Sequence, residues 1–357
     1  IQPIAVQISK LRFFISLVVD QKPTSDATHN FGIRPLPNLE SKFVAANTLI
    51  PVGYDASLFD TTDEIRSKKT KLKELNHQIF LAKRNVDKQR LKEEIKKTRH
   101  ELAKAIKDTG FVNQGAAQLL ANWDMFDQNA SSSFFDSEWM FGVKDGFDIV
   151  IANPPYVNVS NIKPDNYRKT LQTLYYSSRN KSDLYSFFIE KGFNLLNKDG
   201  FQCYIVPHTW KATDSFKKLR EIIFTQHSLL QIVNQKMGVF DAIVNPMIIL
   251  LRNKKASDYD IDVYDGIGTF KYKINVNEII GDPNLSVDSE STLDEKKLFK
   301  SIEKCKHRLS EIIEFSRGIK TSNDQRFIST IQKNSEYKKV FRGRNIKAYS
   351  MNWANEY

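Results

Sequence analysis

The residues with the clearest chemistry are Asn153-Pro154-Pro155-Tyr156, which follow the apolar run Phe147-Asp148-Ile149-Val150-Ile151-Ala152. The side-chain oxygen of Asn153 and the carbonyl of Pro154 can each accept a hydrogen from an exocyclic amine, which favours a tetrahedral nitrogen whose lone pair points at a methyl donor. The prolines fix φ and remove N–H donors, so both acceptors are held before a base arrives. Tyr156 adds a flat face on which a flipped base can stack. These residues predict methyl transfer to the amine of a base such as adenine.

A simple turn is the alternative, because Asn and Pro are common turn residues. The residues before the motif are β-rich and almost uninterrupted in apolarity, as in a central strand of a parallel sheet. Ligands bind beyond the carboxyl ends of such strands. The context favours the catalytic interpretation and predicts a central strand over 147–152 with the motif at its carboxyl end.

Further motifs follow in order: Lys181-Ser182-Asp183-Leu184-Tyr185-Ser186-Phe187-Phe188, then residues 195–201, then Cys203-Tyr204-Ile205-Val206-Pro207 and Trp210. Together with Asn153-Pro154-Pro155-Tyr156 they resemble the amino-methyltransferases of the γ arrangement, in the restriction-modification families typified by TaqI and Eco57I. The resemblance covers most of the chain. It implies an α/β fold with a doubly wound, mostly parallel sheet of the Rossmann-like S-adenosylmethionine-dependent methyltransferase type, a helical insertion and the start of a C-terminal target-recognition domain.

The resemblance also implies roles for individual residues. Phe240, in the loop Val239-Phe240-Asp241 between two apolar strands, is the expected second aromatic against the flipped adenine, although a Phe at a strand end is commonly a core residue. Asp183 and Phe188 are expected to border the cofactor. Asn47 matches the polar residue that bonds the cofactor's adenine, although an Asn in a turn needs no ligand.

The C-terminal segments 313–321 and 340–346 resemble the entry to the family's target-recognition domain. Arg317, Lys320, Arg342 and Arg344 are therefore candidate DNA contacts, expected to reach phosphates. Solvated charges on small β turns are the alternative for each of them.

The chain begins at Ile1 on a segment that resembles the one just after the acidic residue that grips the cofactor ribose in this family. No Gly-x-Gly turn follows a strand before residue 140, and the pair Gly266 and Gly268 fits a surface turn better than a nucleotide loop. We therefore expect a fragment of a longer polypeptide with an incomplete pocket for S-adenosylmethionine, inactive by itself.

Periodicity predicts the elements that position these residues. A helix is expected over 4–19, packed on the sheet, followed by a short strand at 43–46. Apolar residues repeat every seven over 63–108, which predicts a helical hairpin, either a solvated insertion or a clamp for DNA or a partner. The aromatic-rich stretch 111–140 fits a connection packed against the sheet. Crossover helices are expected at 186–197 and 214–226, with Asp199-Gly200 as a helix-ending turn.

The predicted organisation has five parts. Residues 1–62 form an N-terminally truncated cofactor-binding half and 63–108 the hairpin insertion. Residues 109–255 form the catalytic half. A connecting segment, 256–307, contains short β segments and a helix at 293–307, and 308–357 begin the target-recognition domain.

Composition limits the functional classes. A net charge of +11 and a pI near 9.3 favour a polyanionic partner. No apolar run approaches the roughly 20 residues of a membrane span. Cys203 and Cys305 have no paired spacing to histidines, so neither a disulfide framework nor a zinc site is indicated, and a cytoplasmic location is expected.

The resulting hypothesis is a site-specific, adenine-specific methyltransferase that acts on N6 of a flipped adenine in double-stranded DNA, with S-adenosylmethionine as methyl donor and no metal in the transfer step. An endonuclease domain or subunit is plausible from the family, and Mg²⁺ is expected only if such a nuclease lies outside this chain. The same four-residue loop serves methyltransferases of RNA and of protein glutamine, which are the alternatives. A non-catalytic DNA-binding or scaffolding fragment is a further alternative.

Overall fold

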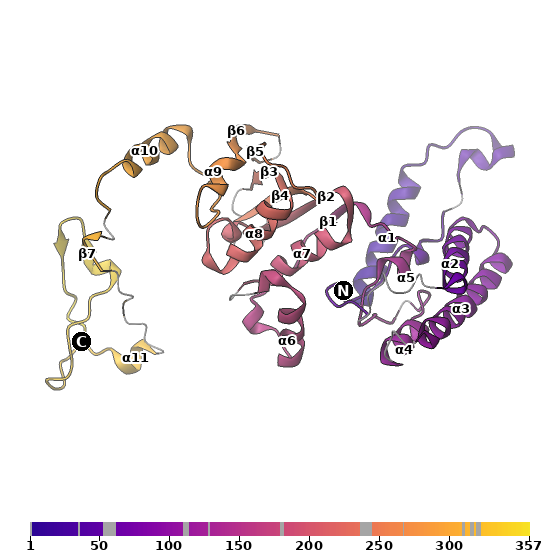
Figure 1. The fold of residues 1–357 in the computed structure, drawn as a ribbon, viewed down its shortest axis with the longest axis horizontal. Helices are drawn as coiled ribbons and strands as arrows, with labels where there is room; N and C mark the ends of the chain where they lie inside the picture. Colours follow the sequence, from indigo (N-terminus) through magenta and orange to yellow (C-terminus); the bar gives the residue numbers. More distant parts are fainter. Residues whose placement is uncertain are drawn as a thin grey trace. The chain divides into compact units, whose positions relative to one another are not determined.

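The computed structural model describes residues 2–34, 36–52, 62–109, 114–127, 129–178, 182–235, 245–266, 268–308, 311–314, 318 and 323–357. Its contacts divide the chain into two units, Ile1–Ser291 and Thr292–Tyr357, which are described separately. Figure 1 shows the course of the chain through both. No helix in the described ranges is long and apolar enough to cross a membrane.

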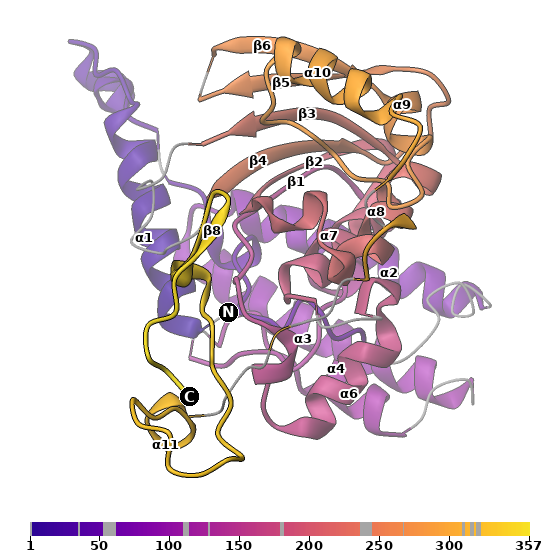
Figure 2. The same ribbon diagram turned by 90° about the vertical axis from the view of Figure 1, so that its left-hand side faces the viewer.

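The centre of the first unit is a six-stranded sheet with the order β1-β2-β4-β3-β5-β6, in which the strands lie side by side (Figure 2). β1 pairs in parallel with β2, and β3 in parallel with β5, whereas β4 is antiparallel to both β2 and β3. β6 is antiparallel to β5. Four strands therefore share one direction, and the predicted α/β fold with a mostly parallel sheet is confirmed. The strands are β1 (Phe147–Ala152), β2 (Leu196–Pro207), β3 (Ser228–Asn234), β4 (Pro246–Arg252), β5 (Asp260–Asp265) and β6 (Phe270–Asn275).

Helix α7 packs closely against β2. Gly192 of α7 lies where a Cβ would come within 2.2 Å of the Gln202 side chain and 2.5 Å of the Tyr204 hydroxyl, so a side chain larger than hydrogen does not fit. Gln202 Nε2 donates to the carbonyl of Ile189, and the Tyr204 hydroxyl to that of Phe188. These bonds fix the register of the helix on the strand. The helices of this region are α6 (Asp165–Leu174), α7 (Tyr185–Leu195), α8 (Lys217–Gln226) and α9 (Val276–Ile280).

The predicted position of residues 147–152 in the sheet needs correction. They form a strand, but β1 is the outer strand of the described sheet instead of a central one. Ile149 and Ile151 are 62% and 77% exposed, because no described strand pairs with the outer edge of β1 and their side chains lie on its uncovered face.

Asp199-Gly200 do not end a helix. α7 ends at Leu195, Leu196 is already extended, and both residues lie within β2. Asp199 adopts φ 69° where the pairing of β1 with β2 shifts register, so the turn-like pair marks an irregularity inside a strand.

The N-terminal helix α1 (Pro3–Val19) forms where periodicity predicts it, but none of its residues is buried. The expected packing of its apolar face on the sheet is therefore wrong for this structure. The predicted strand at 43–46 reduces to one isolated bridge between Ala46 and Ser132, because only the 45–47 backbone meets a partner there.

The helical hairpin over 63–108 is confirmed. The Thr62 hydroxyl caps its first helix by accepting from Ile65 N–H. Most of the apolar stripe is buried, including Leu72, Ile79 and Leu102, whereas Val86 at the start of the second helix is 79% exposed. The same cluster contains Leu120 and Trp139 from following helices, so the hairpin shares a core with its neighbours. The helices are α2 (Asp63–Leu81), α3 (Asn85–Asp108), α4 (Gln114–Asn122) and α5 (Ser137–Phe141).

The second unit, Thr292–Tyr357, contains short elements. Its helix α10 (Leu293–Glu303) begins with a capping box in which Thr292 and Glu295 satisfy each other's backbone N–H groups. The remaining elements are α11 (Asp324–Phe327), β7 (Ile346–Lys347) and β8 (Ser350–Met351). The contact boundary at 291/292 falls within the predicted connecting segment, and β5 and β6 of that segment belong to the main sheet. Short 3-10 segments lie at Ala27–Gly32, Leu39–Ser41, Val159–Asn161, Tyr176–Ser178, His208–Lys211, Asp214–Phe216 and Gly343–Asn345.

Candidate active site

The motif Asn153-Pro154-Pro155-Tyr156 follows directly after the carboxyl end of β1. β2 runs parallel to β1, so its carboxyl end lies at the same edge of the sheet. Pro154 is buried and anchors the loop, whereas Asn153 is exposed. The Asn153 carboxamide is thus accessible to a substrate while the backbone beside it is fixed.

Tyr156 is held from two sides. Its hydroxyl donates to the carbonyl of Ile205 on β2 at 3.0 Å. Its ring meets that of Tyr185 edge to face, with centroids 6.3 Å apart and planes at 83°. Burial raises the pKa of the Tyr156 hydroxyl above its usual value, so this group remains a neutral donor. The ring is half-buried, which leaves part of its face open to a ligand.

The segment after the motif is hydrogen-bonded to the segment around Asp183. Asn158 and Asp183 form an isolated antiparallel bridge, in which Val159 N–H donates to Ser182 at 3.0 Å and Leu184 N–H to Val157 at 2.8 Å. Asn158 Nδ2 also donates to Asp183 Oδ1 at 3.1 Å. The structure therefore brings the catalytic loop and a predicted cofactor residue together across 25 positions of sequence.

The Asp183 carboxyl group is only partly accessible to solvent. Burial raises its pKa, an effect opposed by the hydrogen bond from Asn158. The Ser186 hydroxyl donates to the Asp183 carbonyl at 2.8 Å and fixes the turn into α7. Phe188, one turn further along that helix, is half-buried between two core clusters. A rigid helix start thus presents Asp183.

Asn47 is engaged within the protein. Its Nδ2 lies 3.1 Å and its Oδ1 3.3 Å from the hydroxyl of Tyr167 on α6. A parallel contact, from the Tyr175 hydroxyl to the Leu49 carbonyl at 2.7 Å, joins the same two segments. These contacts explain the position of Asn47 without a ligand, and its cofactor role stays a prediction.

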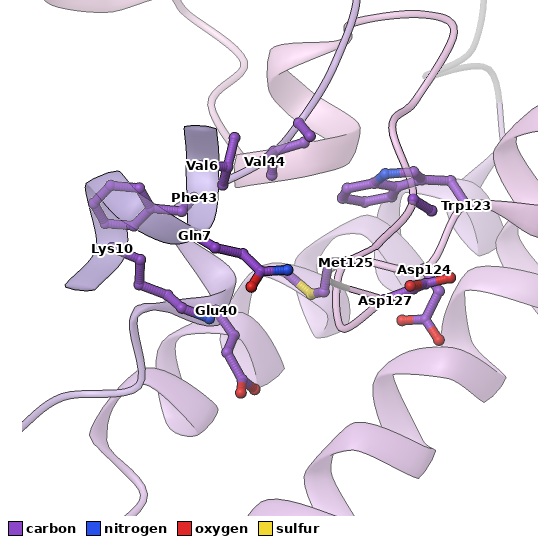
Figure 3. Close-up of a pocket in the computed structure, with 12 residues that line it drawn as sticks. Val6, Gln7, Lys10, Glu40, Phe43, Val44, Trp123, Asp124, Met125 and Asp127 are labelled. Atoms are coloured by element: carbon purple, nitrogen blue, oxygen red, sulfur yellow. The ribbon is translucent and has the colours of Figure 1, made fainter. Parts of the chain in front are cut away.

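A small pocket lies between α1 and the segments around residues 43 and 124 (Figure 3). Its lining includes Trp123 with Asp124 and Asp127 on one side, and Glu40 with Lys10 on the other. The aromatic density of 111–140 predicts a connection packed against the sheet and does not predict a pocket. The signal that could have identified it is the alternation of acidic with aromatic residues in Trp123-Asp124-Met125-Phe126-Asp127.

The remaining predicted site residues lie elsewhere. Phe240, Arg317 and Lys320 fall outside the described residues. Arg342 donates to Glu356 and Asp324, each at 2.8 Å, and Arg344 donates to Glu356 at 2.8 Å. The two arginines are thus engaged in ion pairs within the second unit, and their DNA contacts stay predictions. Across the described ranges, no three His, Cys, Asp or Glu side chains are grouped so as to hold a metal ion.

Comparison with known proteins identifies relatives of the chain. The family model described as Eco57I restriction-modification methylase matches residues 1–240. The type II methyltransferase M.TthHB8I of Thermus thermophilus is 34% identical over 89 residues, which are 22% of this chain and 20% of that protein. The type II methyltransferase M.BstVI of Geobacillus stearothermophilus is 28% identical over 177 residues, 48% of this chain and 29% of the relative.

The chain covers less than a third of the length of either relative. Among solved structures, the methyltransferase subunit of a type I restriction-modification system from Streptococcus thermophilus is similar, with 13% identity over 53% of this chain and 39% of that chain. Its TM-score is 0.29, so this likeness adds no support for a function.

Proposed function

Because this chain belongs to the Eco57I restriction-modification methylase family, we propose that its polypeptide transfers a methyl group from S-adenosylmethionine to N6 of a flipped adenine in double-stranded DNA. The observation that carries the proposal is the loop after β1, where Asn153 is accessible, Pro154 is buried and Tyr156 is bonded to β2. Such a loop offers fixed acceptors beside an open aromatic face.

Asn153 and Pro154 orient the amine. The Asn153 Oδ1 and the Pro154 carbonyl accept the two N6 hydrogens, which directs the nitrogen lone pair out of the plane of the base. S-adenosylmethionine supplies, when bound, a methyl carbon attached to a positively charged sulfur. The methyl group would pass from the donor's sulfur to the amine nitrogen, and Asn153 and the Pro154 carbonyl would pass the released N6 proton to water. No covalent link to the protein is needed.

Tyr156 provides the face on which the flipped base stacks. Its hydroxyl is bonded to Ile205 and therefore fixes the ring plane relative to the sheet. A base that leaves the duplex loses its stacking interactions. Stacking on an aromatic side chain restores roughly 1–3 kcal/mol of that stacking free energy. Phe240 remains our proposed second stacking residue.

Several side chains fit the groups of the methyl donor. A sulfonium, an amino group and ribose hydroxyls all need acceptors, which carboxylates provide. Asp183 is a partly buried carboxylate at the start of α7, and Phe188 lies one turn away. Asp124 and Asp127 beside the Trp123 ring offer a second set of acceptors with a flat surface. We propose Asp183 and Phe188, with Asn47 and Asp124, as the residues that border the donor.

Membership of a restriction-modification family does not favour RNA or protein glutamine as the substrate. One relative, Eco57I of Escherichia coli, is described as both a restriction enzyme and a methyltransferase, and is 28% identical over 94 residues. We therefore propose that an endonuclease domain or subunit works with this methyltransferase. Magnesium would belong to that nuclease.

The test is to express the full-length gene that encodes this chain in a host without adenine methylation, and to map N6-methyladenine by modification-sensitive sequencing. Wild type should modify one short sequence. Asn153→Ala should lower the single-turnover rate about 10²- to 10³-fold, as expected for loss of one preorganised hydrogen-bond partner.

Asn161→Ala is the matched control, since Asn161 is an exposed asparagine of the following 3-10 turn. It should methylate like wild type. Near-normal turnover by a folded Asn153→Ala protein would refute the role of Asn153, and unmodified DNA from folded wild type would refute the proposed substrate.

A further inference from the structure

The helical hairpin carries most of the excess positive charge of the chain. Residues 63–108 contain 15 lysines and arginines against 8 aspartates and glutamates, so they contribute +7 of the net +11. Many of these cations are neutralised by carboxylates on the hairpin or beside it. The ion-paired ones are Arg66, Lys68, Lys69, Lys71, Arg84, Arg90 and Lys92.

A different set of cations lines the groove between α3 and α4. Lys96, His100 and Lys104 are four residues apart on α3 and share one face of the helix, and Lys107 extends that row by one turn. Within the described ranges, none of these three lysines has a carboxylate within 4.0 Å. Three of the hairpin lysines that have no carboxylate within 4.0 Å among the described residues therefore line the groove. The others, Lys73, Lys83, Lys88 and Lys97, lie outside its lining.

The α4 side of the groove is lined by small and amide side chains. Its α4 wall presents small side chains, Ala117 and Ala121, with the exposed amides of Gln118 and Asn122 on either side. Amide N–H groups are common donors to phosphate oxygens. Asp124, at one end, is the acidic residue among the groove's described lining.

Arg99 adds a buried positive charge beneath the row. It is 2% exposed, its guanidinium stacks on the Trp123 ring at 4.2 Å, and one nitrogen donates to the Met125 sulfur at 3.4 Å. Its Nε has no hydrogen-bond partner among the described residues. Burial lowers the pKa of the Arg99 guanidinium to about 9, and the negative charge of Asp124 opposes this effect. Burial of this cation is costly, and an anion bound in the adjacent groove would add to the favourable charge of Asp124.

We propose that the α3–α4 groove binds the sugar-phosphate backbone of duplex DNA, with Lys96, Lys104 and Lys107 in contact with its phosphates. This inference rests on the proposed function, because it assigns the hairpin a share in holding the same DNA substrate. Phosphate contacts of this kind carry affinity and position the duplex, but they do not read sequence.

The test measures binding of the full 357-residue chain to a fluorescent duplex of arbitrary sequence by anisotropy, without cofactor, over a range of salt concentrations. The variant Lys96→Gln/Lys104→Gln/Lys107→Gln removes three charges from the groove. The control Lys83→Gln/Lys88→Gln/Lys97→Gln removes three charges from the hairpin outside the groove lining. Each protein is first checked for an unchanged melting temperature.

Loss of three phosphate contacts should reduce the slope of log affinity against log salt by about 2–3 and weaken binding roughly 10- to 100-fold at moderate salt. The control should stay within about 3-fold of wild type, and a Lys→Arg triple variant of the groove should bind like wild type. Equal behaviour of the groove and control variants would overturn the proposal.

Two further outcomes separate the groove from the methyltransferase function. If wild type methylates DNA and the groove variant binds and methylates like the control, the groove proposal fails and the function stands. If the groove variant binds DNA normally but loses restriction in cells, the groove serves an acidic protein partner and the proposal is overturned. If the 357-residue chain binds DNA through the groove but the product of the full-length gene does not methylate DNA, the function alone is refuted.

Discussion

Tyr156 combines two roles that substitution can separate. Its hydroxyl is bonded to the Ile205 carbonyl at 3.0 Å, and its half-buried ring contacts Tyr185 edge to face. Tyr156→Phe removes only the hydrogen bond, which is worth about 0.5–1.5 kcal/mol. If loss of this hydrogen bond misplaces the loop and the full ~0.5–1.5 kcal/mol is added to the activation free energy, the methylation rate falls about 2- to 10-fold.

Tyr156→Ala removes the ring as well. Loss of base stacking adds roughly 1–3 kcal/mol, or about a further 5- to 150-fold, and this second loss should appear in capture of the flipped base. The assay is single-turnover transfer of a labelled methyl group to the mapped DNA site, with base extrusion followed by 2-aminopurine fluorescence in place of the target adenine. Tyr176→Phe, which removes a hydroxyl bonded to Glu221 on the surface, is the control.

The pattern of losses decides between the roles. The Tyr156→Phe variant should retain base extrusion and show a small decrease in methylation rate. The Tyr156→Ala variant should show a loss of base extrusion and a larger decrease in rate. A Phe variant as impaired as Ala would mean that the hydroxyl takes part in the chemistry, and a near-normal Ala variant would refute stacking on Tyr156. Because burial raises the pKa of this hydroxyl, any decline in rate from its ionisation should begin at a higher pH than for an exposed tyrosine.

Three further predictions concern stability. Gly192→Ala should destabilise the protein by about 1–3 kcal/mol, measured by urea denaturation, because the new methyl group overlaps the buried Gln202 side chain. Burial lowers the pKa of His227 from 6.5 to about 4, so the unfolded chain takes up a proton first as pH falls. Folding stability should therefore decrease between pH 6.5 and about 4, by at most about 3 kcal/mol, and His227→Gln should flatten that dependence; an unchanged profile would contradict this. Burial raises the pKa of Asp183, so its ionisation above pH 3.8 opposes folding. Asp183→Asn keeps an acceptor for Asn158 and should raise the melting temperature at pH 7 while lowering cofactor affinity, whereas a lower melting temperature would refute the desolvation argument.

The elements with strong local patterns were predictable. The seven-residue repeat over 63–108 identified both hairpin helices, and the apolar run at 147–152 identified the strand that carries the motif. Both signals are local, because they depend on the spacing of apolar residues within one helix or one strand, and this spacing can be read directly from the sequence.

Features that depend on contacts between distant segments were not predictable. The bridge between Asn158 and Asp183 joins two polar residues that belong to no periodic pattern. The hydroxyl of Tyr156 donates to a backbone carbonyl, and because every residue has one, the sequence does not indicate which carbonyl accepts. The edge position of β1 depends on strand order, which the alternation within a strand does not encode. Trp123 and Asp124 were overlooked as pocket residues because aromatic packing and ligand binding use the same residue types.

The outer edge of β1 has a consequence for handling this polypeptide. The N–H and C=O groups on this edge have no described strand beside them, and the side chains of Ile149 and Ile151 are exposed to solvent on one face of the strand. Such an edge is a template onto which a strand of another molecule can add. Concentrated solutions of the chain should therefore aggregate through intermolecular β pairing, and a charged residue in place of Ile151 should improve recovery while the loop that follows keeps its geometry.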